Sequence, residues 1–247
     1  MEKWKSFFSS DYLTFSEEIL TSERTDYEIG FIVRQLNLKP GARILDLGCG
    51  QGRISIPLAQ KGFSITGLDG AKDLLEEAKR RAKEHNVDIE FIHRDMREMD
   101  FTEEFDAVIN FGTAFGYIES QKDDQLILKK IHQALKPDGL FIQDLENREA
   151  KVKNLSKQTW YRMNNKLVWS NRNFDYVSGR WNEVIKWHED GVEKQSVLNL
   201  RLYTSSEIIH MNENAGLALK DLFGFFDGQA YTPDSPRMIL KLQKTEG

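Results

Sequence analysis

Residues 42–52 read "ARILDLGCGQG" and decide the fold. The apolar run "ARIL" is typical of a buried strand, and Gly48, Gly50 and Gly52 follow it at alternate positions. Because glycine weakens ordinary secondary structure, three of them directly after a strand indicate a turn that another group approaches closely. A strand, a glycine turn and then a helix are typical of a nucleotide-type site, where helix amides point at the ligand. Arg53 stands where the dinucleotide fingerprint has its third glycine, which disfavours a nicotinamide dehydrogenase.

Strand and helix patterns alternate on both sides of this turn. The expected strands are 42–47, 63–69, 88–93, 105–111 and 139–145, and the expected helices are 21–38, 53–62, 71–86 and 123–136. Short apolar strands separated by helices predict a doubly wound α/β fold, with a parallel sheet covered on both faces. Right-handed crossovers then put the ligand crevice at the carboxyl ends of the strands.

The pattern changes after Glu146. Residues 166–174, 181–189 and 192–203 alternate like strands, and Asp190-Gly191 is a favoured hairpin turn. We therefore predict a three-stranded antiparallel meander inside an inserted subdomain, 148–203, between core segments 1–147 and 204–247. "TSSE" at 204–207 reads as a capping box that opens a helix, and 217–226 and 237–243 read as a closing antiparallel strand pair.

Two acidic residues follow neighbouring strands of the expected sheet. Asp69 ends "SITGLD", where a carboxylate can accept hydrogen bonds from both hydroxyls of a ribose. Asp95 follows the next strand in "FIHRDM", where it can accept from an exocyclic amine such as that of adenine. Each acid alone is typical of a helix cap or a turn. Together with the glycine turn, at successive strand ends, they predict a nucleoside site.

Five motifs of residues 42–144 can be compared with known families: "ILDLGCGQGR", "GLD", "RDM", "FDAVIN" and "LKPDGLFIQD". Through these motifs the segment resembles the class I S-adenosylmethionine-dependent methyltransferases. The resemblance implies a seven-stranded, mostly parallel Rossmann-like sheet with an antiparallel last strand, and S-adenosyl-L-methionine as the cofactor. It also implies a set of cofactor-binding residues: Gly48, Gly50 and Gly52 at the methionine part with Asp46 supporting their turn, Asp69 at the ribose, Asp95 and Met96 at the adenine, Asn110 and Phe111 beside the methionine part near the sulfonium, and in addition Cys49 and Gly70. Arg24, in the N-terminal helix, is a candidate partner for the cofactor carboxylate, although a solvated helix charge is the commoner role.

Composition narrows the class of protein. The 247 residues carry a net charge of -5, which disfavours a nucleic-acid partner, and no apolar run is long enough to span a membrane. One cysteine permits no intrachain disulfide, and the start of the chain lacks a signal-peptide core, so we expect a cytoplasmic enzyme. The five histidines lack ligand spacing, so no metal site is expected.

The expected reaction is an in-line displacement in which a small-molecule amine or hydroxyl attacks the sulfonium methyl. The protein then mainly supplies alignment and a dry site, and aromatic faces such as Phe111, Phe115 and Tyr117 suit the spreading positive charge. A base is harder to assign. The candidates are Tyr12 in the N-terminal arm, Glu146 at the end of the fifth strand, which is favoured because strand ends face the crevice, and His188 in the insertion.

Four tryptophans lie in the insertion, at positions 160, 169, 181 and 187. Trp181, Ile185 and Trp187 share one face of an expected strand, and an aromatic face of this kind must cover something. We expect it to cover the acceptor as a lid and to contact a second copy in a homodimer. Two other readings stay open: a methyltransferase for nucleic acid or protein, although "NFGT" departs from the N-P-P-[YF] of amino-directed DNA enzymes, and a non-catalytic module that binds S-adenosylmethionine.

Overall fold

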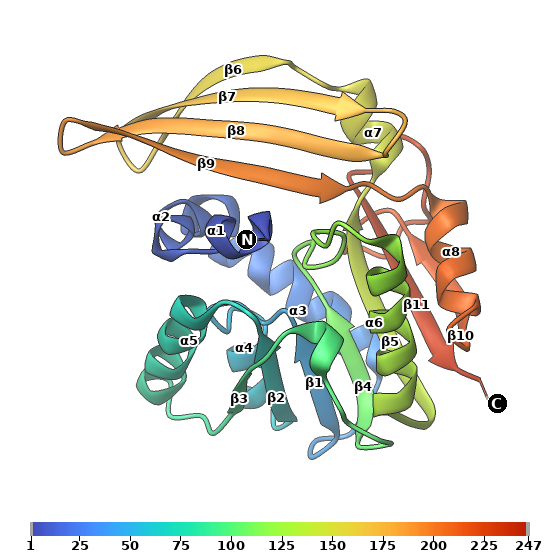
Figure 1. The fold of residues 1–247 in the computed structure, drawn as a ribbon. Coiled ribbons are helices and arrows are strands. Elements are labelled where there is room, and N and C mark those ends of the chain that lie inside the picture. Colours follow the sequence, from blue (N-terminus) through green and yellow to red (C-terminus); the bar gives the residue numbers. More distant parts are fainter. Residues whose placement is uncertain (1, 246–247) are drawn as a thin grey trace.

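The main sheet has seven strands in the order β10-β11-β5-β4-β1-β2-β3 (Figure 1). The structure is a computed structural model that describes residues 2–245, apart from the side chains of residues 10, 14 and 17. The strands are β1 (Arg43–Leu47), β2 (Ser64–Asp69), β3 (Glu90–His93), β4 (Phe105–Asn110), β5 (Leu135–Glu146), β10 (Leu217–Phe223) and β11 (Arg237–Lys244). β1 to β5 pair in parallel, whereas β11 runs antiparallel to both β5 and β10. This confirms the predicted fold class.

Helices cover both faces of this sheet because neighbouring strand residues point to opposite sides. Leu45 packs in a core with Ile131 of α6 (Gln121–Ala134) and Ile208 of α8 (Ser205–Glu213). Ile44, one residue earlier, packs in a second core with Phe31 of α3 (Ser22–Leu36) and with α4 (Ser55–Gln60). α5 (Lys72–Glu84) follows β2, and the short 3₁₀ helix η1 (Met96–Glu98) follows β3. The sheet is therefore buried on both sides, as its apolar strands predicted.

Local signals in the sequence set several helix ends. The Thr204 side chain accepts a hydrogen bond from Glu207 N, and the Glu207 carboxylate accepts from Thr204 N, which confirms the capping box that opens α8. α3 starts after Thr21, whose hydroxyl accepts from Arg24 N at 3.3 Å. It ends at Asn37, which takes a left-handed conformation with φ 48°, a few residues before the expected stop at Pro40-Gly41.

The insertion forms a separate antiparallel sheet with the order β6-β7-β8-β9. After α7 (Arg148–Lys153) come β6 (Gln158–Met163), β7 (Lys166–Asp175), β8 (Arg180–Glu189) and β9 (Val192–Arg201). The prediction of three strands was wrong by one, because β6 adds an edge strand before residue 166. A two-residue turn at Asn164-Asn165 joins it to β7, with φ of 47° and 59°. Asp190-Gly191, with φ of 51° and 78°, forms the second tight hairpin as predicted.

An N-terminal arm lies between the two sheets. Its helices α1 (Lys3–Phe7) and α2 (Ser10–Ile19) sit under the four-stranded sheet and over the end of the main sheet that carries the glycine turn (Figure 1). The Lys194 ammonium of β9 lies 3.1 Å from the Asp11 carboxylate of α2, and α1 packs along β9. None of the helices within residues 2–245 is both long and apolar enough to cross a bilayer.

Candidate active site

The turn after β1 is built for close approach. Gly48, Gly50 and Gly52 all have positive φ, between 52° and 78°, which side-chain-bearing residues rarely adopt. A Cβ on Gly48 would lie 2.5 Å from the Ala114 Cβ, so this position has no room for a side chain. A Cβ on Gly50 would find only a Leu74 methyl at 3.9 Å, so the backbone there faces open space. The turn therefore leaves the main chain of Gly50 available to a ligand.

Asp46 lies in β1, just before the glycine turn. It is 2% exposed, and its Oδ2 accepts a hydrogen bond of 2.6 Å from the Ser55 hydroxyl at the start of α4. Burial raises the pKa of Asp46 to about 6, an effect that the Ser55 hydrogen bond partly opposes. Asp46 therefore ties the strand to the helix that follows the glycine turn.

Asp69 joins the end of β2 to the glycine turn. Its Oδ2 accepts from Gly50 N at 2.8 Å and its Oδ1 from Ala71 N at 2.7 Å. Each carboxylate oxygen can accept a further hydrogen bond, and Asp69 lines the main pocket. Burial raises the pKa of Asp69, and the backbone hydrogen bonds oppose this shift. The main chain thus orients both oxygens and leaves acceptor capacity on the pocket side.

Asp95 and Met96 form the neighbouring wall at the end of β3. Asp95 Oδ1 accepts from Arg97 N at 2.9 Å, and its Oδ2 accepts from the Arg97 guanidinium at 2.7 Å. Burial alone would raise the pKa of Asp95, but these bonds outweigh it and the pKa is lowered. The Met96 Cε reaches to 2.8 Å from a Cβ placed on Gly48. The glycine turn, Asp69, Asp95 and Met96 therefore meet in one place, as predicted.

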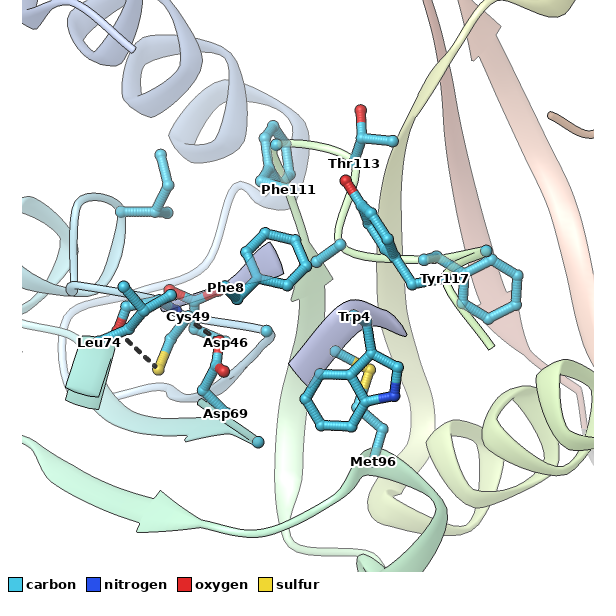
Figure 2. Close-up of a pocket in the computed structure, with 18 of the residues that line it drawn as sticks. Trp4, Phe8, Asp46, Cys49, Asp69, Leu74, Met96, Phe111, Thr113 and Tyr117 are labelled. Carbon is cyan, nitrogen blue, oxygen red and sulfur yellow. Dashed lines mark hydrogen bonds between the residues drawn. The ribbon is translucent and has the colours of Figure 1, made fainter. Parts of the chain in front are cut away.

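These residues line a pocket with about 990 Å³ of empty space, part of it open to solvent. Figure 2 shows Phe8 and Trp4 of the N-terminal arm in the space between Asp69 and Tyr117. A Cβ on Gly70 would lie 2.5 Å from the Trp4 ring, so the glycine after Asp69 makes room for the indole. The arm forms the roof of the pocket, and sequence patterns did not single out Trp4 or Phe8.

The cation at this pocket is Arg53 rather than Arg24. Arg24 Nε donates to the Glu28 carboxylate at 2.8 Å, and Arg53 binds the other oxygen of the same buried group. Arg53 also donates to the Thr25 hydroxyl at 3.0 Å and lines the pocket, whereas Arg24 is not among the described residues that line it. Two guanidinium groups share the Glu28 carboxylate, so this one carboxylate does not neutralise both of them.

The loop after β4 packs against the arm, where the Tyr117 ring meets the Phe8 ring edge-on at 4.9 Å. Phe111, Thr113 and Tyr117 line the pocket (Figure 2). Asn110 lies just below: its Nδ2 donates to Leu47 O at 2.6 Å, and its buried Oδ1 has no partner among the described residues. Arg237 of β11 fixes the loop through a 2.6 Å hydrogen bond to the Thr113 hydroxyl. Sequence patterns gave no signal for that role of Arg237.

The three expected base residues occupy different places. Tyr12 lines the pocket, and burial raises its pKa. Glu146 is paired with Arg237 at 2.9 Å and with Lys151 at 3.2 Å, and these cations overcome the effect of burial and lower its pKa to about 2. His188 is exposed on β8, facing away from the arm. The structure brings only Tyr12 of the three to the described pocket.

A further carboxylate, Asp124 of α6, lines the same pocket. It is fully buried, its Oδ2 accepts from the Tyr203 hydroxyl at 2.5 Å, and its Oδ1 has no partner among the described residues. Burial raises the pKa of Asp124 to about 6. In the sequence it looks like any acidic residue in the first turn of a helix, so nothing marked it. No group of three His, Cys, Asp or Glu residues in the described chain is arranged to hold a metal ion.

The insertion's tryptophans divide between its two faces. Trp181 and Trp187 are buried on the face toward the arm, and the Trp187 ring meets Phe15 of α2 edge-on at 4.8 Å. Trp160 and Trp169 pair on the outer face, where Trp160 is 66% exposed. The predicted shared face of Trp181, Ile185 and Trp187 is therefore present, and the arm lies against it.

Comparison with known sequences finds methyltransferases, both with a family model and among individual relatives. A family model described as a methyltransferase domain matches residues 44–139. The putative methyltransferase YqeM of Bacillus subtilis is 27% identical over 223 residues, 86% of this chain and 88% of the relative. The glycine/sarcosine N-methyltransferase of Aphanothece halophytica is 31% identical over 142 residues, 56% of this chain and 54% of the relative. The chain spans about half the length of most of the curated relatives it matches.

Among solved structures, the CcbJ methyltransferase of Streptomyces caelestis resembles the whole chain. It has a TM-score of 0.85 and 16% identity, and the match covers 99% of this chain and 98% of that one. At this identity the likeness concerns the fold, including the inserted sheet and the N-terminal arm.

Proposed function

We propose, from the premise that this chain belongs to the class I S-adenosylmethionine-dependent methyltransferases, that it methylates an amine or hydroxyl of a small molecule. The observation that carries the proposal is a single pocket shared by two sets of residues. The glycine turn, Asp69 and Asp95 form one part, and the aromatic side chains of the arm and of the loop after β4 form the other. Cofactor and acceptor would thus meet in one space, away from bulk water.

The residues of the pocket fit S-adenosylmethionine. Asp69 has oriented carboxylate oxygens with acceptor capacity left for the ribose hydroxyls. Asp95 and Met96 provide an acceptor and an apolar surface for the adenine. Arg53 supplies positive charge for the amino-acid carboxylate beside the open backbone of Gly50. Trp4 adds a buried Nε1 with no partner among the described residues, which can donate to a bound ligand.

The cofactor supplies an activated methyl group on a positively charged sulfur. The chain's own contribution is alignment and exclusion of water. Phe8, Phe111 and Tyr117 put aromatic surface around the expected transfer point, where it suits cationic charge. Because its pKa is raised, Tyr12 stays protonated and would orient the acceptor through its hydroxyl. Asp124 holds a carboxylate oxygen that can receive a proton from the acceptor near neutral pH.

A small acceptor is favoured over a polymer by the covering of the pocket. The arm helices and the four-stranded sheet lie over the carboxyl edge of the main sheet (Figure 1), and the net charge is -5. A nucleic-acid enzyme needs an open, basic surface at its site. A non-catalytic module would bind the cofactor without room for an acceptor, whereas this pocket extends past Met96 to Tyr117 and Asp124.

The test combines binding with transfer. Calorimetry with S-adenosylhomocysteine and with NAD should show binding of the first only. Transfer of a labelled methyl group should then be measured with panels of amines, phenols and carboxylic acids, and with tRNA and a mixed protein substrate. We expect label on an amine or phenol. Label on tRNA or protein alone would refute the small-molecule proposal, and cofactor binding without transfer to any of them would favour the non-catalytic module.

A further inference from the structure

A second pocket lies beside the main one, between α2 and the inner face of the four-stranded sheet. It holds about 460 Å³ of empty space, part of it open to solvent. Its walls are mainly apolar: Phe15 and Ile19 of α2, Met163 of β6, Val168 of β7, and Ile185 and Trp187 of β8. Tyr12 lines both pockets, so its side chain stands between the two spaces.

Two of the polar side chains at this second pocket are paired. Asp11 is bound to Lys194 at 3.1 Å, which neutralises the acidic group at its edge. The Tyr161 hydroxyl is 3.1 Å from the Ser170 hydroxyl. Trp187 Nε1, in contrast, is buried and has no hydrogen-bond partner among the described residues. An unpaired buried N–H is costly, and an oxygen on a ligand removes that cost.

We propose that this second pocket binds an apolar group of the methyl acceptor, an aromatic ring or a branched alkyl chain that carries an oxygen for Trp187 Nε1. The inference rests on the proposed function, because it places the acceptor's amine or hydroxyl past Tyr12 in the main pocket. A wholly polar acceptor would leave the apolar walls without contacts and the indole N–H unpaired. The acceptor class is therefore amphipathic, with its reactive group at one end.

The same geometry predicts how affinity grows with the acceptor. Each methylene that enters the pocket should increase affinity about fourfold until the space is filled. Suitable probes are phenol, 4-ethylphenol and 4-butylphenol, which join a hydroxyl to an apolar group of increasing length. 4-(2-Methoxyethyl)phenol has a tail as long as that of 4-butylphenol and carries an ether oxygen for Trp187 Nε1. The protein is labelled with 5-fluorotryptophan, and the Trp187 resonance is assigned by its absence in Trp187→Phe.

Two substitutions on β9 form a matched pair. Ser196 lines the second pocket, so Ser196→Phe fills it, whereas Gln195→Phe adds the same ring to the exposed face one residue earlier. Met163→Trp fills the pocket from β6 and guards against a local folding defect at residue 196. In every protein, calorimetry with S-adenosylhomocysteine reports separately on the cofactor site.

We expect 4-butylphenol to bind at least tenfold more tightly than phenol, and 4-(2-methoxyethyl)phenol to shift the Trp187 fluorine signal more than 4-butylphenol does. Ser196→Phe and Met163→Trp should abolish that gain, and Gln195→Phe should keep it. Affinity that does not depend on alkyl length, an unmoved Trp187 signal, or equal effects of Ser196→Phe and Gln195→Phe would overturn the inference. If the unmodified protein does not bind S-adenosylhomocysteine, the proposed function is refuted instead, so the two failures are distinguishable.

Discussion

Asp69 holds a backbone amide of the glycine turn and also lines the main pocket. Its oxygens hold the amides of Gly50 and Ala71, and the same oxygens face the main pocket. The hydrogen bonds shape the glycine turn, and under the proposed function the pocket side of the carboxylate would hold the ribose. Both depend on the position of Asp69 at a strand end next to the turn, and local motifs were sufficient to predict that position.

Replacing Asp69 should weaken cofactor binding. Asp69→Asn keeps the shape but removes the charge and one acceptor, so S-adenosylhomocysteine should bind about 1–3 kcal/mol less tightly. Calorimetry measures this directly. Asp88→Asn, an exposed change before β3, is the control and should leave the affinity unchanged. Equal affinities for Asp69→Asn and the unmodified protein would contradict the ribose assignment.

Arg53 and Arg24 can be separated by the choice of ligand. Because Arg53 lines the pocket, Arg53→Gln should weaken S-adenosylhomocysteine about tenfold, in line with the loss of one charged hydrogen bond. 5′-Methylthioadenosine lacks the amino-acid carboxylate, so its affinity should hardly change. Arg24→Gln removes the other guanidinium on Glu28 and should affect neither ligand strongly. A larger effect of Arg24→Gln on S-adenosylhomocysteine would restore the assignment made from the sequence.

Residues such as Asp124 and Arg237 show where sequence-based prediction ends. Each has a type that is usually solvated on a helix or strand, and nothing nearby in the sequence marks it. Their roles arise from partners far along the chain, since Asp124 meets Tyr203 and Arg237 meets Thr113. Motif residues were predictable because their partners are local, whereas these needed the packed fold.

Asp124 should give stability a specific pH dependence. Burial raises its pKa from 3.8 to about 6. A carboxyl whose pKa is higher in the folded state stabilises the fold when protonated, so this contribution is complete below about pH 4 and is lost as pH rises through about 6. The shift corresponds to about 3 kcal/mol. Relative to the unmodified protein, Asp124→Asn should therefore gain unfolding free energy, by up to about that amount, between pH 4 and 7.

Urea denaturation across this range measures the effect. Asp123→Asn is the matched control, one residue earlier and more exposed. A constant difference between Asp124→Asn and the unmodified protein from pH 4 to 7 would show that the buried carboxylate does not titrate in this window.

At the scale of elements, the main sheet was predictable and the insertion only partly so. Parallel strands buried on both faces are continuous apolar runs, and their order follows from crossover rules. β6 has none of these signals: as an edge strand with exposed Gln158, Trp160 and Arg162, it reads as a polar segment. Its turn also uses Asn164-Asn165 instead of a glycine pair. β6 is a strand because it pairs with β7, and no local sequence pattern predicts it.

Arg237 joins β11 to β5 and to the loop after β4, and its loss should destabilise all three. Its Nε lies 2.8 Å from the fully buried Asp144 carboxylate, so Arg237→Met leaves a buried charge without its cation. We expect a loss of about 3–5 kcal/mol in unfolding free energy. Adding Asp144→Asn should recover part of it. Arg43→Met, which breaks the exposed pair with Glu104, should cost less than about 1 kcal/mol. Urea denaturation of the four proteins tests the comparison, and similar losses for Arg237→Met and Arg43→Met would contradict it.

At the scale of the whole molecule, the N-terminal arm contacts both the main pocket and the four-stranded sheet. α1 and α2 contribute Trp4, Phe8 and Tyr12 to the main pocket, and the other side of α2 borders the second pocket through Phe15. A ligand in the main pocket therefore contacts the arm, and the arm contacts the four-stranded sheet. Cofactor binding should therefore change the amide exchange of segments that are remote from the glycine turn in sequence.

Hydrogen exchange can test this coupling. Adding S-adenosylhomocysteine should slow amide exchange in residues 3–19 as well as around the glycine turn, because the ligand packs against the arm's inner residues. α8, which packs on the far side of α6, serves as the internal control and should not change. Trp4→Ala should reduce protection of the arm more than protection of the turn, since the indole is the arm's contact with Gly70. Protection confined to the turn in the unmodified protein would mean that the arm does not close on the cofactor, and the covered pocket would then lose its part in selecting small acceptors.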